Sequence, residues 1–256
     1  HVRLLVEPGA RFQIDSLQVA GARQIREPEV LHVVRSHSDT VWHRGILRAD
    51  RLREDAAAIQ AFYVSRGFPH VSVAVPEVIA APLESRATVV FRVQEGPRVS
   101  VRAARFEGTS SLPPDRLQAL AALREGVPYT PGEAEAAAVR LRRAHDDAGF
   151  PDARVKVRPD RVGGDADAEE VDLVFEIAEG RRQTIAEVSI AGNRLTDEQV
   201  VRKALTVEPN DPLSRADLIA SQNRLYRLGL FRSVELRPVT APATGQEPPQ
   251  PAAPAT

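Results

Sequence analysis

The sequence predicts an α+β protein made of tandem two-layer modules, each a three-stranded mixed sheet covered by two helices. Three observations predict this fold class. Glycine-marked phrases recur along the chain, short segments alternate apolar and polar residues as strands do, and two helical patterns follow the first strand of each repeat. The predicted order within a module is therefore strand–helix–helix–strand–strand.

Recurrent landmarks set the length of the module. One set of glycines lies between an acidic and a basic residue, and a second set ends an apolar–spacer–Gly phrase. Both sets are separated by 87 and then 84 residues: Gly9, Gly96 and Gly180, and Gly21, Gly108 and Gly192. An aromatic landmark is spaced by 82 and then 81 residues: Phe68, Phe150 and Phe231. The three sets predict a repeating unit of about 80–90 residues, the size of a small domain.

Each module begins with a strand that ends at a glycine of the second set. In the first module, Leu17 and Val19 stand four and two positions before Gly21, which is the period of a strand. Ile14 stands seven positions before it, and this change of phase indicates a bulge or a change of direction. A short helix is expected next, because Pro28 suits a first helical turn.

A longer helix follows the short one. Four residues of the first module lie on one helical face: Leu52, Ala56, Ile59 and Tyr63. Three helix starts carry an N-cap residue and a polar residue three positions later: Thr130 with Glu133, Thr196 with Gln199, and Ser214 with Asp217. The aromatic residues near the ends of the long helices are expected in the core: Tyr63, Phe68, Phe150, Tyr226 and Phe231.

Two alternating strands close each complete module. In the first module the last strand carries Val89, Phe91 and Val93 and ends just before Gly96. The predicted segments are a final strand of a preceding, truncated module (1–9), two complete modules (10–96 and 97–180), a module lacking its last strand (181–239) and a disordered Pro/Ala-rich linker (240–256). We expect the missing strand of the third module beyond Thr256.

Composition excludes several function classes. The formal net charge of -1 gives no basic field for nucleic acid, so no nucleic-acid partner is expected. The chain has no Cys, which excludes thiolate chemistry and disulfides. No phosphate loop, nucleophile elbow or metal-ligand spacing is found, so we expect no enzyme, no cofactor and no metal.

The repeated phrases resemble those of POTRA (polypeptide-transport-associated) domains of BamA-like outer-membrane barrel-assembly proteins. The shared features are a first strand ending in Gly, a long helix closing on Tyr and then Gly67-Phe68, and a last strand ending in Glu95-Gly96. The resemblance covers nearly the whole chain except the Pro-rich tail. It implies an arm on the periplasmic side of the outer membrane. Its implied partners are unfolded outer-membrane proteins, accessory lipoproteins and a C-terminal membrane barrel of the same parent chain.

The resemblance also implies that the second strand of each module is a sheet edge. Such an edge presents unpaired backbone groups to which an extended peptide adds as a further strand. The predicted peptide-binding residues are Val71, Ser72, Val73, Ala74 and Val75 in the first module, Ala153, Arg154, Val155, Lys156 and Val157 in the second, and Val234, Glu235 and Leu236 in the third. Pro76 in the first module and Lys156 and Arg158 in the second are residues that blunt an edge.

Two other interpretations remain open from the sequence. The arm of a secretion or lipid-export barrel, TamA-like or of the two-partner type, would use the same modules for other clients. A passive spacer would have rigid joints and bind no client, and the short junctions at 95–98 and 179–182 permit it. Crosslinking of a client to 70–76 or 153–158 would argue against the spacer.

Overall fold

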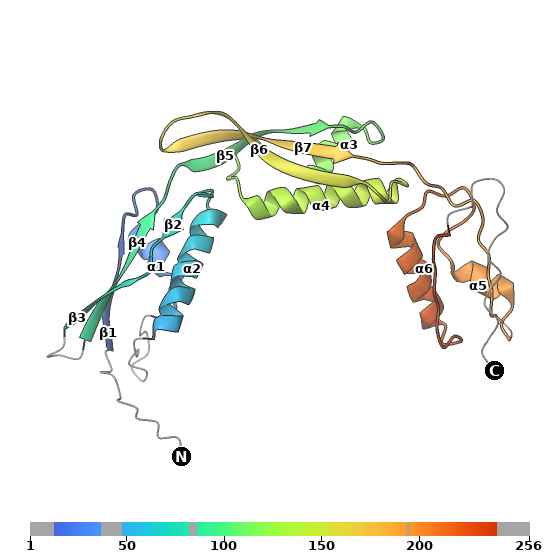
Figure 1. Ribbon diagram of the computed structural model, residues 1–256, viewed down its shortest axis with the longest axis horizontal. Helices are drawn as coiled ribbons and strands as arrows, with labels where there is room; N and C mark the ends of the chain where they lie inside the picture. The colour runs from blue at the N-terminus through green and yellow to red at the C-terminus, as the bar shows by residue number, and fades with distance from the viewer. Residues whose placement is uncertain (1–12, 37–47, 82–85, 194, 240–256) are drawn as a thin grey trace, which may run out of the picture. The chain divides into compact units, whose positions relative to one another are not determined.

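The computed structural model describes residues 13–36, 48–81, 86–193 and 195–239. The chain divides into two compact units, His1–Arg142 with Arg154–Ala178 and Arg143–Ala153 with Glu179–Thr256 (Figure 1). Unit 1 contains the first predicted module and the sheet of the second. Unit 2 contains the third module and the last turn of the second module's long helix. The predicted strand at 1–9 and the predicted linker at 240–256 lie outside the described residues.

The first module has one mixed sheet and two helices. Its elements are β1 (Gln13–Ala20), α1 (Glu27–Leu31), α2 (Ala49–Ser65), β2 (Ser72–Val73), β3 (Glu77–Ala81) and β4 (Arg86–Gln94). β1 pairs with β4 in parallel, whereas β2 and β3 pair with β4 antiparallel. The last strand in sequence is therefore the central strand of the sheet.

The second module repeats this topology. Its elements are β5 (Arg98–Glu107), α3 (Pro114–Ala121), α4 (Pro131–Asp147), β6 (Arg154–Gly164) and β7 (Ala168–Ala178). The strand order is β5-β7-β6, with β5 parallel and β6 antiparallel to β7. The register shifts between Ile14 and Ser16 in β1 and between Val101 and Ala103 in β5. These irregularities confirm the bulge predicted from the change of phase.

The core of the first module lies between its sheet and its helices. Val89, Phe91 and Val93 of the central strand are at most 3% exposed, as the alternating pattern predicts. Ile59 and Tyr63 of α2 are fully buried against this cluster. Because burial of each large side chain contributes about 1.5–3 kcal/mol, this seam is the main source of the module's stability.

Two of the three predicted capping residues begin their helices. The Thr130 hydroxyl accepts from the Glu133 N–H at 3.4 Å, and the Ser214 hydroxyl accepts from the Asp217 N–H at 3.3 Å. The prediction of Thr196 as a cap is wrong. Asp197 caps α5 (Glu198–Ala204), since its carboxylate accepts from the Gln199 N–H at 2.8 Å and Asp is as strong an N-cap as any residue.

The third module has helices but no assigned strands among its described residues. It contains α5 and α6 (Arg215–Arg227), and the segments predicted as its strands run without a sheet partner. Tyr226 is 46% exposed, so its predicted place in a core is wrong. The physical reason is the topology. In both complete modules the last strand in sequence is the central strand of the sheet, and the third module has no such strand among its described residues to cover Tyr226.

None of the helices in the described part of the chain combines the length and the apolar character needed to cross a membrane.

Candidate peptide-binding edges

The second strand of each complete module is an outer strand. β2 and β3 lie on one side of β4, and β6 lies on one side of β7. Each therefore has one row of backbone N–H and C=O groups that no strand of its own sheet uses. These rows are the chemical basis of the candidate site, because an extended chain can pair with them.

A proline interrupts the outer strand of the first module. The Ala74 N–H donates to the Arg92 carbonyl at 2.9 Å, which continues the pairing one residue beyond β2. Pro76 has no N–H to donate, and the ladder to β4 resumes after it as β3. The outer strand is thus longer than the sequence predicted, with an irregular step in the middle.

The five residues predicted for this edge fall in different environments. Ser72 and Val73 form β2, and Ala74 extends it. Val71 precedes the strand and is 4% exposed, so it closes the core. Val75 lies at the step before the proline and is 83% exposed.

The more accessible part of the edge, β3, was missed by the sequence prediction. All of its residues are exposed, including Val78 at 38% and Ile79 at 55%. The available signal was the pair of adjacent β-branched residues Val78 and Ile79, which follow Pro76 and Glu77, since such residues favour strands. The proline concealed it, because a proline commonly ends a strand.

The outer strand of the second module is continuous but carries charge and proline. Four of the five predicted residues lie in β6, and Ala153 precedes it with 7% exposure. The Arg158 Nε donates to Glu176 Oε1 at 2.9 Å on the central strand, and Pro159 removes one N–H from the edge. Together with Lys156, these residues are features that discourage strand addition.

The third predicted edge is not a strand. Val234, Glu235 and Leu236 have no ladder partner among the described residues. The Val234 carbonyl accepts from Gln222 Nε2 at 2.8 Å and from the Tyr226 hydroxyl at 3.2 Å. Side chains of α6 therefore occupy backbone groups that a strand would use.

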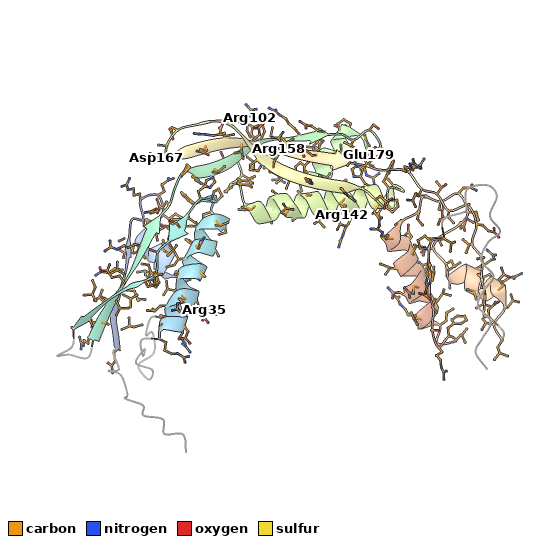
Figure 2. All side chains as sticks on the ribbon, viewed as in Figure 1. Arg35, Arg102, Arg142, Arg158, Asp167 and Glu179 are labelled. Carbon is orange, nitrogen blue, oxygen red and sulfur yellow. The ribbon has the colours of Figure 1, made fainter. Side chains whose placement is uncertain are left out.

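A buried carboxylate is paired on the second sheet. Asp172 of β7 is fully buried and accepts two hydrogen bonds from Arg102, at 2.8 and 2.7 Å. Arg105 pairs with the same carboxylate. The Arg102 hydrogen bonds, followed by its charge and that of Arg105, lower the pKa of Asp172. Arg102 and Arg158 are labelled on this sheet in Figure 2. Asp172 therefore links β7 to the two arginines of β5 within the sheet.

Among the residues that the structure describes, no group of three or more His, Asp or Glu side chains could hold a metal ion.

Curated relatives carry one recurring name. The "Outer membrane protein assembly factor BamA" of Neisseria meningitidis serogroup B is 22% identical over 249 residues, covering 95% of this chain and 31% of the relative. The protein of the same name from Nitratidesulfovibrio vulgaris is 25% identical over 240 residues, covering 91% and 30%. The chain thus spans about a third of the length of the curated relatives it matches.

Solved structures share the fold. The Haemophilus influenzae BamA POTRA3-5 structure is 19% identical with a TM-score of 0.53, covering 95% of both chains. Haemophilus ducreyi BamA lacking POTRA domains 1-3 is 20% identical with a TM-score of 0.50, covering 68% of this chain and 30% of that one. At these identities the likeness concerns the fold alone.

A family model covers more than half of the chain. The POTRA model, described as a surface antigen variable number repeat, matches residues 99–180 and 183–250. These ranges begin near the junctions that the glycine landmarks predicted, and the strand order within 99–180 agrees with the fold class expected from the sequence. The chain belongs to the POTRA family.

Proposed function

We propose that this chain is the periplasmic substrate-receiving and scaffolding arm of an outer-membrane protein assembly factor. Family membership and the names of the BamA relatives support this assignment. In this proposal a membrane barrel of the same parent chain, unfolded outer-membrane proteins and accessory lipoproteins are the partners.

The observation that carries the proposal is the open outer strand of the first module. β3 is exposed along its whole length, and among the residues that the structure describes it pairs with β4 and no other strand. A client segment would add as a further strand, with main-chain hydrogen bonds providing affinity for many different sequences. Each such bond contributes about 0.5–1.5 kcal/mol net, so a short addition is weak and reversible. Reversibility suits an arm that passes clients on.

The first module is the preferred receiving site within the chain. Its β3 presents Val78 and Ile79 after Pro76 and Glu77, whereas β6 of the second module presents Lys156, Arg158 and Pro159 within one strand. Charged side chains and proline on an edge oppose pairing with a further strand. We therefore expect clients to add at 72–81 before they add at 154–164.

The test is a backbone NMR titration of the full chain with a neutral peptide of alternating Val and Thr. The proposal expects amide shifts at 72–81, and shifts confined to the helices would contradict it. Ile79→Lys places a charge on the edge and should abolish the shifts, because a lysine there opposes strand addition. Val139→Lys is the matched control, since Val139 on α4 is also exposed, at 40%, and lies on no edge. A passive spacer would show no shifts in any variant.

A further inference from the structure

A cavity of about 400 Å³ lies in unit 1, beside the loop that follows β1. Four charged residues line it: Arg26, Glu29, Arg66 and Arg98. They come from separate elements, because Arg26 and Glu29 belong to the start of α1, Arg66 caps the end of α2, and Arg98 opens β5. The presence of three arginines in the lining of one cavity is not explained by the edge described above.

The charges of this cavity are not balanced. Glu29 Oε1 lies 2.7 Å from Arg26 Nε, and its Oε2 lies 3.8 Å from Arg66 Nη1. Arg66 also lies over the Phe62 ring, with 4.8 Å between the guanidinium carbon and the ring centre. One carboxylate thus serves two of the three arginines that line the cavity, and the neighbouring Glu95 carboxylate accepts instead from the Tyr63 hydroxyl and from the Gln24 and Ile25 N–H groups.

Arg98 is the cation left over. Its backbone N–H donates to the Asp167 carbonyl at 2.8 Å, which fixes where the side chain starts. Within the described ranges its guanidinium has no ion pair and no hydrogen bond. A guanidinium presents a planar fork of donors that fits a carboxylate with two parallel bonds.

The remaining lining residues are the polar Gln24 and the apolar Ile25 and Phe68. Ile25 and Phe68 border the cavity and are 9% and 2% exposed, so they offer only small parts of their surfaces. A cationic rim above an apolar floor suits a carboxylate carried on an aliphatic stem, such as an acidic side chain of a peptide. Small inorganic anions would make no use of that floor.

We propose that this cavity binds an acidic side chain of an extended peptide, with Arg98 as the principal contact. That the ligand is a peptide rests on the proposed function. β2, which begins four residues after Phe68, belongs to the edge proposed to receive client peptides. In this proposal, one end of a chain laid along that edge reaches the cavity. Arg98 would then favour clients with an acidic residue at that end of the paired segment.

The experiment compares two blocked peptides with the same Val/Thr centre, one with Glu and one with Gln at both ends. Affinities are measured by NMR titration of the full chain at low and at high salt. We expect the Glu peptide to bind about two- to five-fold more tightly, as a partly exposed ion pair allows, and the difference to shrink at high salt. Arg98→Gln should remove the difference. Arg53→Gln on α2, which takes away the same charge from an exposed position outside the cavity, should preserve it.

The outcomes separate this inference from the proposed function. Equal binding of the two peptides, or a preference for Glu that survives Arg98→Gln, overturns the carboxylate site while shifts at 72–81 still support the edge. If neither peptide shifts the amides at 72–81, the proposed peptide-binding edge is wrong. The inference that the cavity binds a side chain of a peptide on that edge is then wrong as well. Sodium acetate is the third arm. If it shifts the Gln24 and Ile25 amides with the affinity of the Glu peptide, a free anion is the ligand and the peptide inference is wrong.

Discussion

The Tyr63 hydroxyl donates to Glu95 Oε1 at 3.0 Å, where the central strand of the first sheet ends. The same buried carboxylate accepts from the backbone N–H groups of Gln24 at 3.0 Å and Ile25 at 3.4 Å. Burial, and then the hydrogen bond to Glu95, raises the pKa of Tyr63, so the hydroxyl stays protonated and donates at neutral pH. Glu95 thereby connects the end of α2 to the loop after β1.

The second module places a histidine near the corresponding glutamate. His145 Nε2 lies 3.6 Å from Glu179 Oε1, and His145 is fully buried. Tyr63 and His145 both stand five residues before their landmark phenylalanine, and Glu95 and Glu179 both precede their landmark glycine. The recurrent Glu-Gly phrase thus places a glutamate at the end of each central strand, close to the aromatic or imidazole side chain near the end of the long helix.

Tyr63→Phe should lower the free energy of unfolding of the first module by about 1–2 kcal/mol. The substitution removes a donor from a buried carboxylate while the ring stays in place. Tyr129→Phe is the control, because Tyr129 is only partly buried and its hydroxyl has no hydrogen-bond partner among the described residues. Urea unfolding followed through amide signals of each module measures both. Equal losses of unfolding free energy in the two variants would show that the hydrogen bond to Glu95 does not stabilise the first module.

Gly108→Ala should destabilise the second module more than Gly126→Ala does. Both glycines have left-handed backbones, with φ of +77° and +79°, so alanine costs each about 1–2 kcal/mol in backbone strain. A Cβ on Gly108 would lie 2.3 Å from the Ile177 carbonyl oxygen, whereas a Cβ on Gly126 meets nothing within 4 Å. The overlap adds about 1–3 kcal/mol for Gly108→Ala. Urea unfolding of the two variants checks the difference, and matching values would contradict the close approach of the two strands.

Local sequence signals predicted the modules and their helix caps. Features that depend on pairing between strands distant in sequence were not predicted. The glycine that ends each first strand was predicted from its spacing, and its cause is the central strand's carbonyl, as Gly108 illustrates. The Thr130 and Ser214 caps were correct because a cap depends on residues within one helical turn. The β3 segment was missed because its pairing with β4 outweighs the preceding proline. Such pairing depends on residues distant in sequence, which a local pattern does not contain.

Asp172 should give the second module a stability that is lost in acid. Its pKa is lowered in the folded chain by the hydrogen bonds from Arg102, while an unfolded Asp has a pKa near 3.9. Because the folded pKa is the lower one, the contribution is present above about pH 4 and disappears as the pH falls through the folded pKa. Asp172→Asn should therefore destabilise the module at neutral pH and flatten its loss of stability below pH 4.

The control for this pH dependence is Asp15→Asn. Asp15 pairs with Arg86 at 3.0 Å, but the two side chains are 49% and 56% exposed, so water and salt weaken their interaction. Urea unfolding between pH 2.5 and 7 compares the variants. If the stability of Asp172→Asn falls with decreasing pH as steeply as that of the parent, the Arg102–Asp172 contact does not cause the loss of stability in acid.

The third module should bind a central strand supplied as a separate peptide. A Cβ on Gly21 would lie 2.1 Å from the Val93 carbonyl oxygen, whereas a Cβ on its counterpart Gly192 meets nothing within 4 Å. Tyr226, the counterpart of the buried Tyr63, is 46% exposed. The place that β4 fills in the first module is therefore open in the third, as far as its described residues show.

A peptide copying residues 168–180, which form β7 and its Glu-Gly end, should fill that place by pairing parallel to 185–191 and antiparallel to 233–237. NMR titration should then shift amides of both segments and the ring signals of Tyr226. Gly192→Ala should weaken binding about ten-fold or more, because its Cβ would meet the new strand's carbonyl. Gly229→Ala carries a similar backbone cost, with φ of +67°, at the end of α6, and should bind as the parent does. A scrambled peptide that binds equally well would mean that the third module has no such strand site. Shifts confined to the first and second modules would mean the same.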